Sequence, residues 1–417
     1  MKRHSTLLIA IAILVSVFAT QAGAAPKTIK FAVWGLQEKS TQGYFEQIKT
    51  GFEKANPGVV IEWVSYPYGQ IKDQVLILSS AGEVPDLVQS DRASLPGFAD
   101  SGFFAPVDTI MSKTYLDDVY ADLRSALTIN GKMWAVPWFY SPFVLYYSTD
   151  LFKKAGLDPA KPPKTYEEAA AYGAKISALK DKDGNQVYGL GLTTGSVPVS
   201  GSYLLAMLYS YGGSLWDASG KPQANNPQTL AILSYLKSAY EKKLNPEVAK
   251  LKDLRNLFGI GRLGMYFDQL WGISGAYAVN PKARDWTAVA MPMGGNGAKA
   301  ASTLEAHLLM VGADSKVKGE VAKLVEFITS AEQLNVYQNI NPFLVARKTV
   351  NARVELIDPF VKPLGEAAAT IRPIPNFPRI DDQLLALATA AQTVTVGKAE
   401  PAAAAAELDK ALKTLAK

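Results

Sequence analysis

Residues 130–156 read NGKMWAVPWFYSPFVLYYSTDLFKKAG, and this stretch decides the fold of the chain. Asn130-Gly131 predicts a β-hairpin, because both central positions of a type I′ turn need a positive φ that these residues adopt readily. Pro137 is expected to end the pairing of the second hairpin strand, since proline has no N–H to donate. A dense aromatic cluster follows, and then a buried strand leads into a helix. A hairpin, an aromatic loop, a strand and a helix therefore meet at one crossing point.

The helix that closes this stretch has recognisable ends. Ser148 or Thr149 can cap it, because a side-chain oxygen accepts a hydrogen bond from a free backbone N–H of the first turn. Gly156 predicts its end, because glycine adopts the left-handed conformation that commonly closes a helix.

Strands and helices alternate through the first hundred residues. The predicted strands are the short apolar runs 28–34, 59–64 and 86–89. Helical periodicity separates them, and this βαβαβ order requires right-handed crossovers and a parallel sheet. Ligands of such open sheets bind outside the carboxyl ends of the strands. These ends are residues 34–37, 65–68 and 90–92.

The length and the cysteine content bound the class of protein. A chain of 417 residues predicts about two to three domains, and it contains no cysteine. Residues 1–24 are typical of a secretory signal peptide, with a basic start, a short apolar run and a small-residue cleavage site. We expect the mature protein to begin at Ala25 or Pro26 and to be periplasmic. Without cysteine, disulfides, thiolate metal sites and a cysteine-linked lipid anchor are excluded.

Charge and histidine content argue against several other classes. The formal net charge of +5 falls to +3 once Lys2 and Arg3 leave with the signal peptide. The remaining Lys and Arg residues are scattered, so we expect no nucleic-acid partner, which would need a basic face. His4 also leaves, and His307 is then the only histidine. A catalytic triad or a zinc site based on histidine has no second member, and we expect no metal and no cofactor.

Three sequence blocks carry a family resemblance. They are FEKANPGVVIEW (52–63), PDLVQSDRASLPGFADSGFFAPVD (85–108) and NGKMWAVP (130–137). In order and spacing they resemble the extracellular solute-binding proteins of carbohydrate ABC importers, family 1, which includes maltose- and glycerol-phosphate-binding proteins. The resemblance covers essentially the whole mature chain. It implies an α/β, two-lobed periplasmic-binding-protein fold of type II with three interlobe crossings, at about 133–137, 286–291 and 341–345.

The resemblance also implies a domain division and a function. Residues 25–135 plus 288–341 are expected to form the N-terminal lobe, and 136–287 plus 342–417 the C-terminal lobe. The expected function is to capture a small carbohydrate or sugar derivative between the lobes and to deliver it, as a monomer, to membrane-embedded ABC permease subunits. The aromatic residues favour a mono-, di- or small oligosaccharide, whereas Arg92 and the basic excess leave an anionic sugar derivative open.

Candidate ligand-binding residues lie at strand ends and interlobe loops. Aromatic rings there can lie against the apolar face of a sugar, and carboxylates, amides and a guanidinium can bind its hydroxyls. By resemblance, Asp91-Arg92 stands where sugar-binding relatives hold hydroxyls, and Trp271 follows the family's glycine-bounded strand. The candidates are Trp34, Gln37, Tyr66, Asp91, Arg92, Tyr140, Ser141, Tyr266, Asp268, Trp271, Glu305 and His307.

Two other function classes are alternatives to a binding protein. A secreted glycoside hydrolase needs two carboxylates across a cleft, and Glu305, Asp268 and Asp91 could supply them. Two similar α/β lobes argue against it, since the expected fold is neither a barrel nor a sandwich. A sensor or adhesin would bind no saturable small ligand.

Two local motifs are rejected by their context. Residues 259–264 match a dinucleotide-binding fingerprint, but a helical segment precedes them and a strand follows, the reverse of what that motif needs. The loop that begins at Asp181 starts like a calcium loop, but Leu192 stands where the bidentate acid would be.

Overall fold

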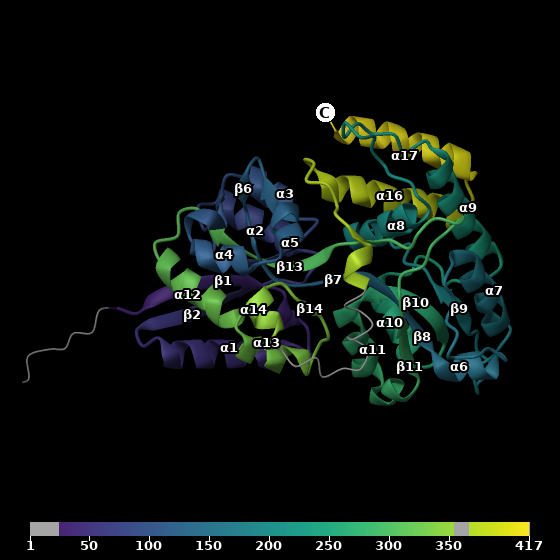
Figure 1. The fold of residues 1–417 in the computed structure, drawn as a ribbon, viewed down its shortest axis with the longest axis horizontal. Coiled ribbons are helices and arrows are strands. Elements are labelled where there is room, and N and C mark those ends of the chain that lie inside the picture. Colours follow the sequence, from purple (N-terminus) through teal and green to yellow (C-terminus); the bar gives the residue numbers. More distant parts are fainter. Residues whose placement is uncertain (1–24, 354–366, 417) are drawn as a thin grey trace, which may run out of the picture.

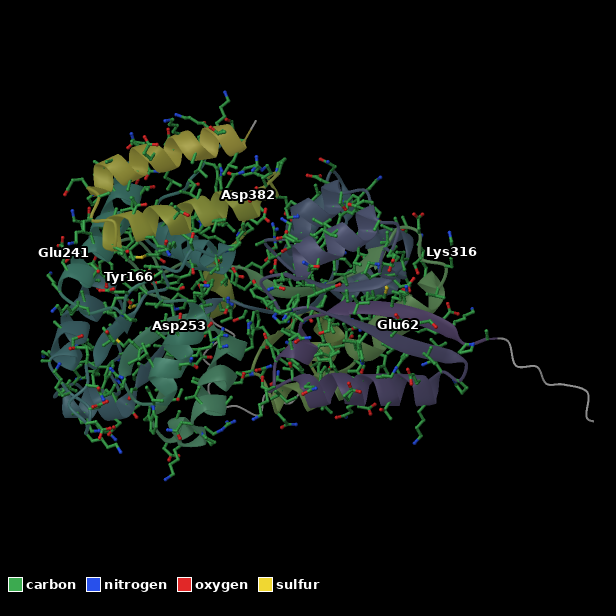
Figure 2. All side chains as sticks on the ribbon, turned by 180° about the vertical axis from the view of Figure 1, so that it is seen from behind. Glu62, Tyr166, Glu241, Asp253, Lys316 and Asp382 are labelled. Carbon is green, nitrogen blue, oxygen red and sulfur yellow. The ribbon has the colours of Figure 1, made fainter. Side chains whose placement is uncertain are left out.

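The computed structural model describes residues 25–353 and 367–416, and the expected signal peptide lies outside them. Figure 1 shows two lobes side by side, each a sheet flanked by helices. Within the described residues, no helix is both long and apolar enough to cross a membrane. Figure 2 shows acidic and basic side chains mixed over the outer surface, where Glu62, Glu241 and Lys316 are exposed, while Tyr166 is buried.

The first lobe is built on a seven-stranded sheet of order β14-β7-β13-β3-β1-β2, with β4 paired to β13. Its strands are β1 (Lys27–Val33), β2 (Val59–Ser65), β3 (Leu87–Asp91), β4 (Phe104–Ala105), β7 (Val136–Ser141), β13 (Glu305–Gly312) and β14 (Leu344–Val345). Its helices are α1 (Gln42–Ala55), α2 (Ile71–Ser80), α3 (Leu95–Asp100), α4 (Lys113–Asp118), α5 (Ala121–Ala126), α12 (Lys318–Ile328), α13 (Ala331–Gln338) and α14 (Lys348–Asn351). β1 pairs in parallel with β2 and β3, which confirms the predicted βαβαβ unit.

The second lobe is built on a four-stranded sheet of order β11-β8-β10-β9. Its strands are β8 (Phe143–Ser148), β9 (Tyr188–Gly191), β10 (Leu263–Gln269) and β11 (Thr287–Ala290). Its helices are α6 (Thr149–Lys154), α7 (Tyr166–Ser177), α8 (Pro198–Ser210), α9 (Pro227–Glu241), α10 (Leu251–Gly259), α11 (Ile273–Val279), α16 (Ile380–Thr395) and α17 (Pro401–Leu415). A short parallel pair, β12 (Ser302–Thr303) with β15 (Ile371–Arg372), lies between elements of both lobes.

The Asn-Gly hairpin is confirmed. β5 (Thr128–Ile129) and β6 (Lys132–Met133) pair antiparallel around Asn130 and Gly131, whose φ values are 52° and 75°. The predicted effect of Pro137 is wrong, because this residue lies inside β7, opposite Leu308. The register of β13 against β7 shifts between His307 and Leu308. Such an irregularity accommodates Pro137, because a proline has no N–H to donate to the hydrogen bonds between the strands.

The helix after β8 has the predicted ends. The Ser148 hydroxyl accepts a hydrogen bond from the Leu151 N–H at 3.2 Å, so Ser148 is the cap of α6. Gly156 follows the helix with a φ of 70°. All six residues of β8 are buried, as a strand covered on both faces requires.

The two sheets place the crossings differently from the expected division. β7 belongs to the sheet of the first lobe and β8 to that of the second, so the first crossing is at Pro142 rather than at 133–137. β11 belongs to the second sheet, and the chain returns to the first between Ala290 and Glu305. β14 is still part of the first sheet, so the third crossing follows Val345. β7 and β8, on the two sides of the first crossing, are both largely buried, so their apolar patterns are alike.

The second lobe depends on a close contact between two buried helices. α8 packs against α16, although about 180 residues separate them in the chain. Gly201 of α8 lies so close to α16 that a Cβ there would be 2.0 Å from the Leu384 carbonyl oxygen. Only glycine allows this approach, which brings the C-terminal segment onto the core of the second lobe.

Gly201→Ala should therefore destabilise the protein. We expect a loss of about 1–3 kcal/mol in the free energy of unfolding, because a methyl group against a backbone carbonyl forces the two helices apart. Urea denaturation followed by circular dichroism measures it. Gly319→Ala in α12 is the matched control, since a Cβ there meets nothing within 4 Å. Equal stability of both variants would show that the α8–α16 contact accommodates the added methyl group without a loss in the free energy of unfolding.

Candidate functional site

Three antiparallel strands form the floor of the candidate site. His307 of β13 pairs with Asp91 of β3 on one side and with Phe139 of β7 on the other. Directly opposite residues of neighbouring strands point to the same face of a sheet, so these three side chains form a row. Glu305, two residues before His307, lies on the same face. The row therefore combines an imidazole, a phenyl ring and two carboxyl groups.

Aromatic rings from both lobes converge on His307. Its ring centroid lies 5.0 Å from that of Trp34, 4.5 Å from that of Phe139 and 4.7 Å from that of Trp271. Tyr68 extends the group, with its ring 5.3 Å from Trp34. We call these five residues the aromatic cluster. Trp271 follows β10 of the second sheet, whereas the other four residues belong to the first lobe, so the cluster joins the lobes.

A buried glutamine, Gln89, holds the backbone at Trp34 in place. The backbone N–H groups of Trp34 and Gly35 donate to Gln89 Oε1 at 3.2 and 3.3 Å. A Cβ on Gly35 would lie 2.0 Å from a ring carbon of Phe45, so only glycine lets the chain turn here. The indole is 2% exposed and Tyr68 is 40% exposed. Trp34 therefore supplies a rigid wall and Tyr68 an accessible edge.

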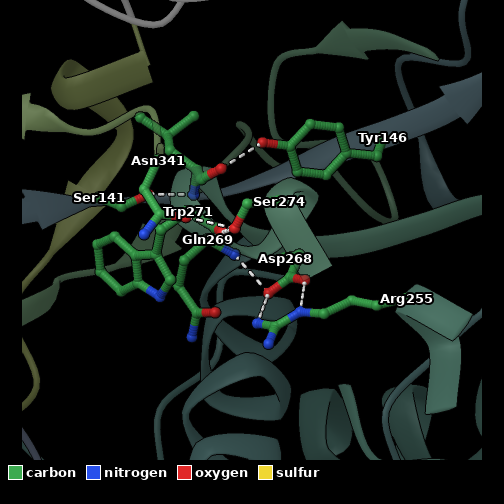
Figure 3. Close-up of polar contacts among 9 residues, drawn as sticks. Ser141, Tyr146, Arg255, Asp268, Gln269, Trp271, Ser274 and Asn341 are labelled. Carbon is green, nitrogen blue, oxygen red and sulfur yellow. Dashed lines mark hydrogen bonds and ion pairs between the residues drawn. The ribbon is translucent and has the colours of Figure 1, made fainter. Parts of the chain in front are cut away.

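Trp271 is positioned by a buried ion pair. The Arg255 guanidinium donates to the Asp268 carboxylate at 2.6 and 2.9 Å (Figure 3), and Asp268 has no exposed surface. A Cβ on Gly272 would lie 2.0 Å from Asp268 Oδ2, so the chain passes directly over the carboxylate. Asp268 thus supports the turn that carries Trp271. It leaves no free face for a ligand.

Ser141 connects the end of β7 to the same turn. Its hydroxyl accepts a hydrogen bond from the Leu270 N–H at 2.8 Å and donates to the Pro142 carbonyl at 2.6 Å. On the other side of the turn, the Ser274 hydroxyl donates to the Asn341 side chain, which comes from the first lobe (Figure 3). Ser141 is fully buried, so it also acts as a structural contact between the lobes.

Arg92 holds a segment of the C-terminal part of the chain against the first lobe. Its Nη2 donates to the Ile374 carbonyl and to Asn376 Oδ1. Asn376 Nδ2 in turn donates to the carbonyls of Ala126 and Thr128 at 3.1 and 3.0 Å. Arg92 has no exposed surface, and its Nε and Nη1 have no partner among the described residues. Two nitrogens of a buried cation, which carry three N–H groups, are therefore left for further acceptors.

Two carboxyl groups stand beside Arg92. Asp91 is half-buried, and its Oδ1 accepts a hydrogen bond from the Ser94 N–H at 2.8 Å. Glu305 is 7% exposed. Burial, together with the nearby Asp91, raises the pKa of Glu305 to about 8, and Arg92 offsets this only in part. In the unliganded protein at neutral pH, Glu305 is therefore mainly a protonated acid that can donate as well as accept a hydrogen bond.

The other predicted site residues lie apart from the aromatic cluster. Gln37 is exposed and donates to the Ser65 hydroxyl at 3.0 Å, and Tyr66 is a half-buried neighbour of the first core. Tyr140 points away from His307, into apolar clusters at the lobe junction. Tyr266 has no exposed surface and stacks on Tyr146 at 5.4 Å in the second core. All residues of β10 are buried, so its sequence shows no alternation of polar and apolar residues that would mark Tyr266 as a core residue.

Sequence reasoning missed three residues that the structure places at the site: Tyr68, Gln89 and Phe139. Tyr68 lies in the expected strand-end stretch 65–68, so its position was a usable signal. Phe139 was one ring of a dense aromatic run, and only the register with His307 distinguishes it from its neighbours. Gln89 sits within a buried strand, where nothing in the sequence marks it.

The raised pKa of Glu305 predicts how stability depends on pH. The folded state holds this proton up to about pH 8, whereas an unfolded glutamate loses it near 4.5, so the stability that Glu305 contributes is full below 4.5 and is lost as pH rises through 8. Relative to Glu305→Gln, wild-type stability should fall by about 1.4 kcal/mol per pH unit across that window. Urea denaturation at several pH values tests this, with exposed Glu46→Gln as control. A constant difference between wild type and Glu305→Gln would contradict the assignment.

Comparison with known proteins adds the family. A binding protein of Brucella abortus is 28% identical over 385 residues, covering 89% of this chain and 90% of its own. The mannitol-binding protein of Pseudomonas aeruginosa is 23% identical over 392 residues, covering 86% and 88%. An ABC transporter solute-binding protein of Thermotoga lettingae, crystallised with α-D-tagatose, superposes with a TM-score of 0.85 at 22% identity, covering 94% of this chain and 100% of its own.

The structural match confirms the expected two-lobed α/β fold. The family match spans residues 36–334, which include most of the residues of the aromatic cluster and its carboxylates. The family is one of binding proteins, which confirms that the chain is not an enzyme and removes the support for the hydrolase alternative. The chain belongs to the bacterial extracellular solute-binding proteins.

Proposed function

We propose that this protein is a periplasmic substrate-binding protein that captures a small carbohydrate between its lobes and delivers it to ABC permease subunits. The observation that carries the proposal is the aromatic cluster, which both lobes build beside a half-buried carboxylate. Flat rings cover the apolar C–H faces of a sugar, and the neighbouring carboxyl groups of Asp91 and Glu305 bind its hydroxyls. A relative named as a mannitol-binding protein and a structural neighbour crystallised with tagatose support a carbohydrate as the ligand class.

The proposed lobes follow the sheets. The first comprises residues 25–141 and 305–353, and the second comprises 143–303 and 367–416. Ligand contact with Trp34, Asp91 and His307 on one side and with Trp271 on the other then favours the closed arrangement, because only a ligand that touches both sides binds it better. The protein is proposed to work as a monomer, without a nucleic-acid partner.

The proposed roles of the candidate residues divide by position and by the partners that their polar atoms already have. We propose that Trp34, Tyr68, Asp91, Trp271, Glu305 and His307 contact the sugar. Arg92 is proposed to donate to ligand oxygens through its two unpartnered nitrogens, Nε and Nη1, while Nη2 holds Ile374 and Asn376. Asp268 and Ser141 are proposed to position the turn of Trp271. A hydrolytic role for Asp268 has no geometric support, since Arg255 occupies both of its oxygens.

Sugar binding should be visible as a thermal shift that depends on Trp271. A panel of D-mannitol, D-tagatose, maltose and glycerol 3-phosphate is added at millimolar concentration, because a ligand at one hundred times its dissociation constant stabilises by about 2.7 kcal/mol. We expect at least one neutral polyol or sugar to raise the midpoint. Trp271→Ala should weaken its binding by about tenfold, because it removes a stacking surface from one lobe.

The matched control is Trp286→Ala, which removes another half-buried indole of the second lobe outside the cluster. It should bind the same sugar as wild type does. A panel that gives no shift in wild type would count against carbohydrate binding. Equal losses in both variants would remove Trp271 from the site.

A further inference from the structure

Gln89 is buried beneath the aromatic cluster and contacts its central ring. It is 1% exposed, and its Nε2 lies 3.3 Å from Nδ1 of His307. The other end of its amide, Oε1, receives the N–H groups of Trp34 and Gly35. One side chain therefore connects the turn after β1 to the imidazole in the middle of the proposed site.

The two backbone donors fix the orientation of this amide. An NH₂ group placed against the N–H groups of Trp34 and Gly35 would set donors against donors, so the oxygen must face them. The NH₂ group then faces Nδ1 of His307. A protonated Nδ1 would again set donor against donor, and Nδ1 is therefore the acceptor. A neutral imidazole with Nδ1 unprotonated carries its proton on Nε2.

The surroundings of His307 keep the ring neutral. It packs among Trp34, Phe139 and Trp271, and this burial lowers the pKa of His307 to about 3. The carboxyl groups on its face are Asp91 and Glu305, and the Gln89 amide opposes a proton on Nδ1. Within the described part of the chain, Nδ1 has Gln89 as its partner and Nε2 has no hydrogen-bond acceptor.

We propose that Gln89 is a positioning residue that holds His307 as the Nε2–H tautomer, so that the site presents a fixed neutral donor to a ligand oxygen. The inference rests on the proposed function only for the identity of that acceptor. It has a consequence for specificity. A hydroxyl or ring oxygen of a sugar can accept from Nε2–H, whereas an ammonium group, which has no lone pair, is disfavoured at this position.

The mature chain offers a direct test, because His307 is its only histidine. Protein expressed from residue 25 without a histidine tag, and labelled with ¹⁵N-histidine, gives one imidazole. In unliganded wild type we expect a pyridine-like Nδ1 signal and a pyrrole-like Nε2 signal, unchanged from pH 8 to pH 5. A protonated Nδ1, or a ring that titrates in this range, would overturn the proposal whether or not the protein binds sugar.

Gln89→Glu separates positioning from packing. A carboxylate has nearly the same shape and still accepts from Trp34 and Gly35, but toward the ring it can only accept, so Nδ1 should become protonated. We expect the pyrrole-like signal to move to Nδ1, or both nitrogens to become pyrrole-like. A purely structural role for Gln89 would leave the tautomer unchanged. If the buried charge prevents folding, Gln89→Met is the alternative variant, because methionine offers no N–H and no strong acceptor. The His307 ring in this variant should be a mixture of both tautomers.

Binding provides the second readout. For the polyol or sugar that shifts wild type most, Gln89→Glu should weaken binding by about tenfold or more, the range for a hydrogen bond lost at a buried site. Gln47→Glu adds the same charge on the exposed face of α1 and should bind as wild type does. A changed tautomer with unchanged affinity would show that Nε2–H does not contact the sugar.

Discussion

The site depends on the pairing of β13 between β3 and β7. This antiparallel register puts His307 opposite both Asp91 and Phe139, although the chain separates His307 from each of them by more than 160 residues. A shift by one residue would turn His307 and Glu305 to the other face, since side chains alternate along a strand. The proline and the irregularity beside it fix the place where the register changes. The row of polar and aromatic side chains is therefore a product of sheet pairing, and the loops add only its walls.

Local signals in the sequence predict much of this fold, and non-local pairing explains what they miss. The hairpin at Asn130-Gly131, the cap at Ser148 and the βαβαβ unit depend on neighbours in the chain, and all are confirmed. The lobe to which β7 belongs depends on partners far away, which no local pattern reveals. The same holds for the site. Strand ends and family blocks predict Trp34 and Trp271 as site residues, and His307 is a candidate as the one histidine of the mature chain. The burial of Tyr266 and the contact made by Gln89 follow only from the sheets.

The chemistry of the site divides into stacking surfaces and directional groups. Trp34 and Trp271 supply apolar surface from opposite lobes, and rings offer much area at little conformational cost. The hydrogen-bonding groups are held in place by hydrogen bonds to other parts of the protein. Arg92 is held by the segment at 374–376, and His307 by Gln89. Such preorganisation favours affinity, because less freedom is lost when the ligand arrives. Under the proposed function, the buried ion pair of Arg255 and Asp268 would then act on binding indirectly, by holding the turn that carries Trp271.

The central claim is that the two lobes close on a small carbohydrate. Small-angle X-ray scattering of the mature wild-type protein, with and without the sugar that gives the largest thermal shift, tests it most directly. Within the described residues, the chain connects two separately packed cores at Pro142 and between Ala290 and Glu305, and such connections allow a hinge rotation. A ligand bound by both lobes should then populate the closed form. The account predicts a smaller radius of gyration with saturating sugar. Identical scattering profiles, with binding shown by calorimetry in the same sample, would contradict it.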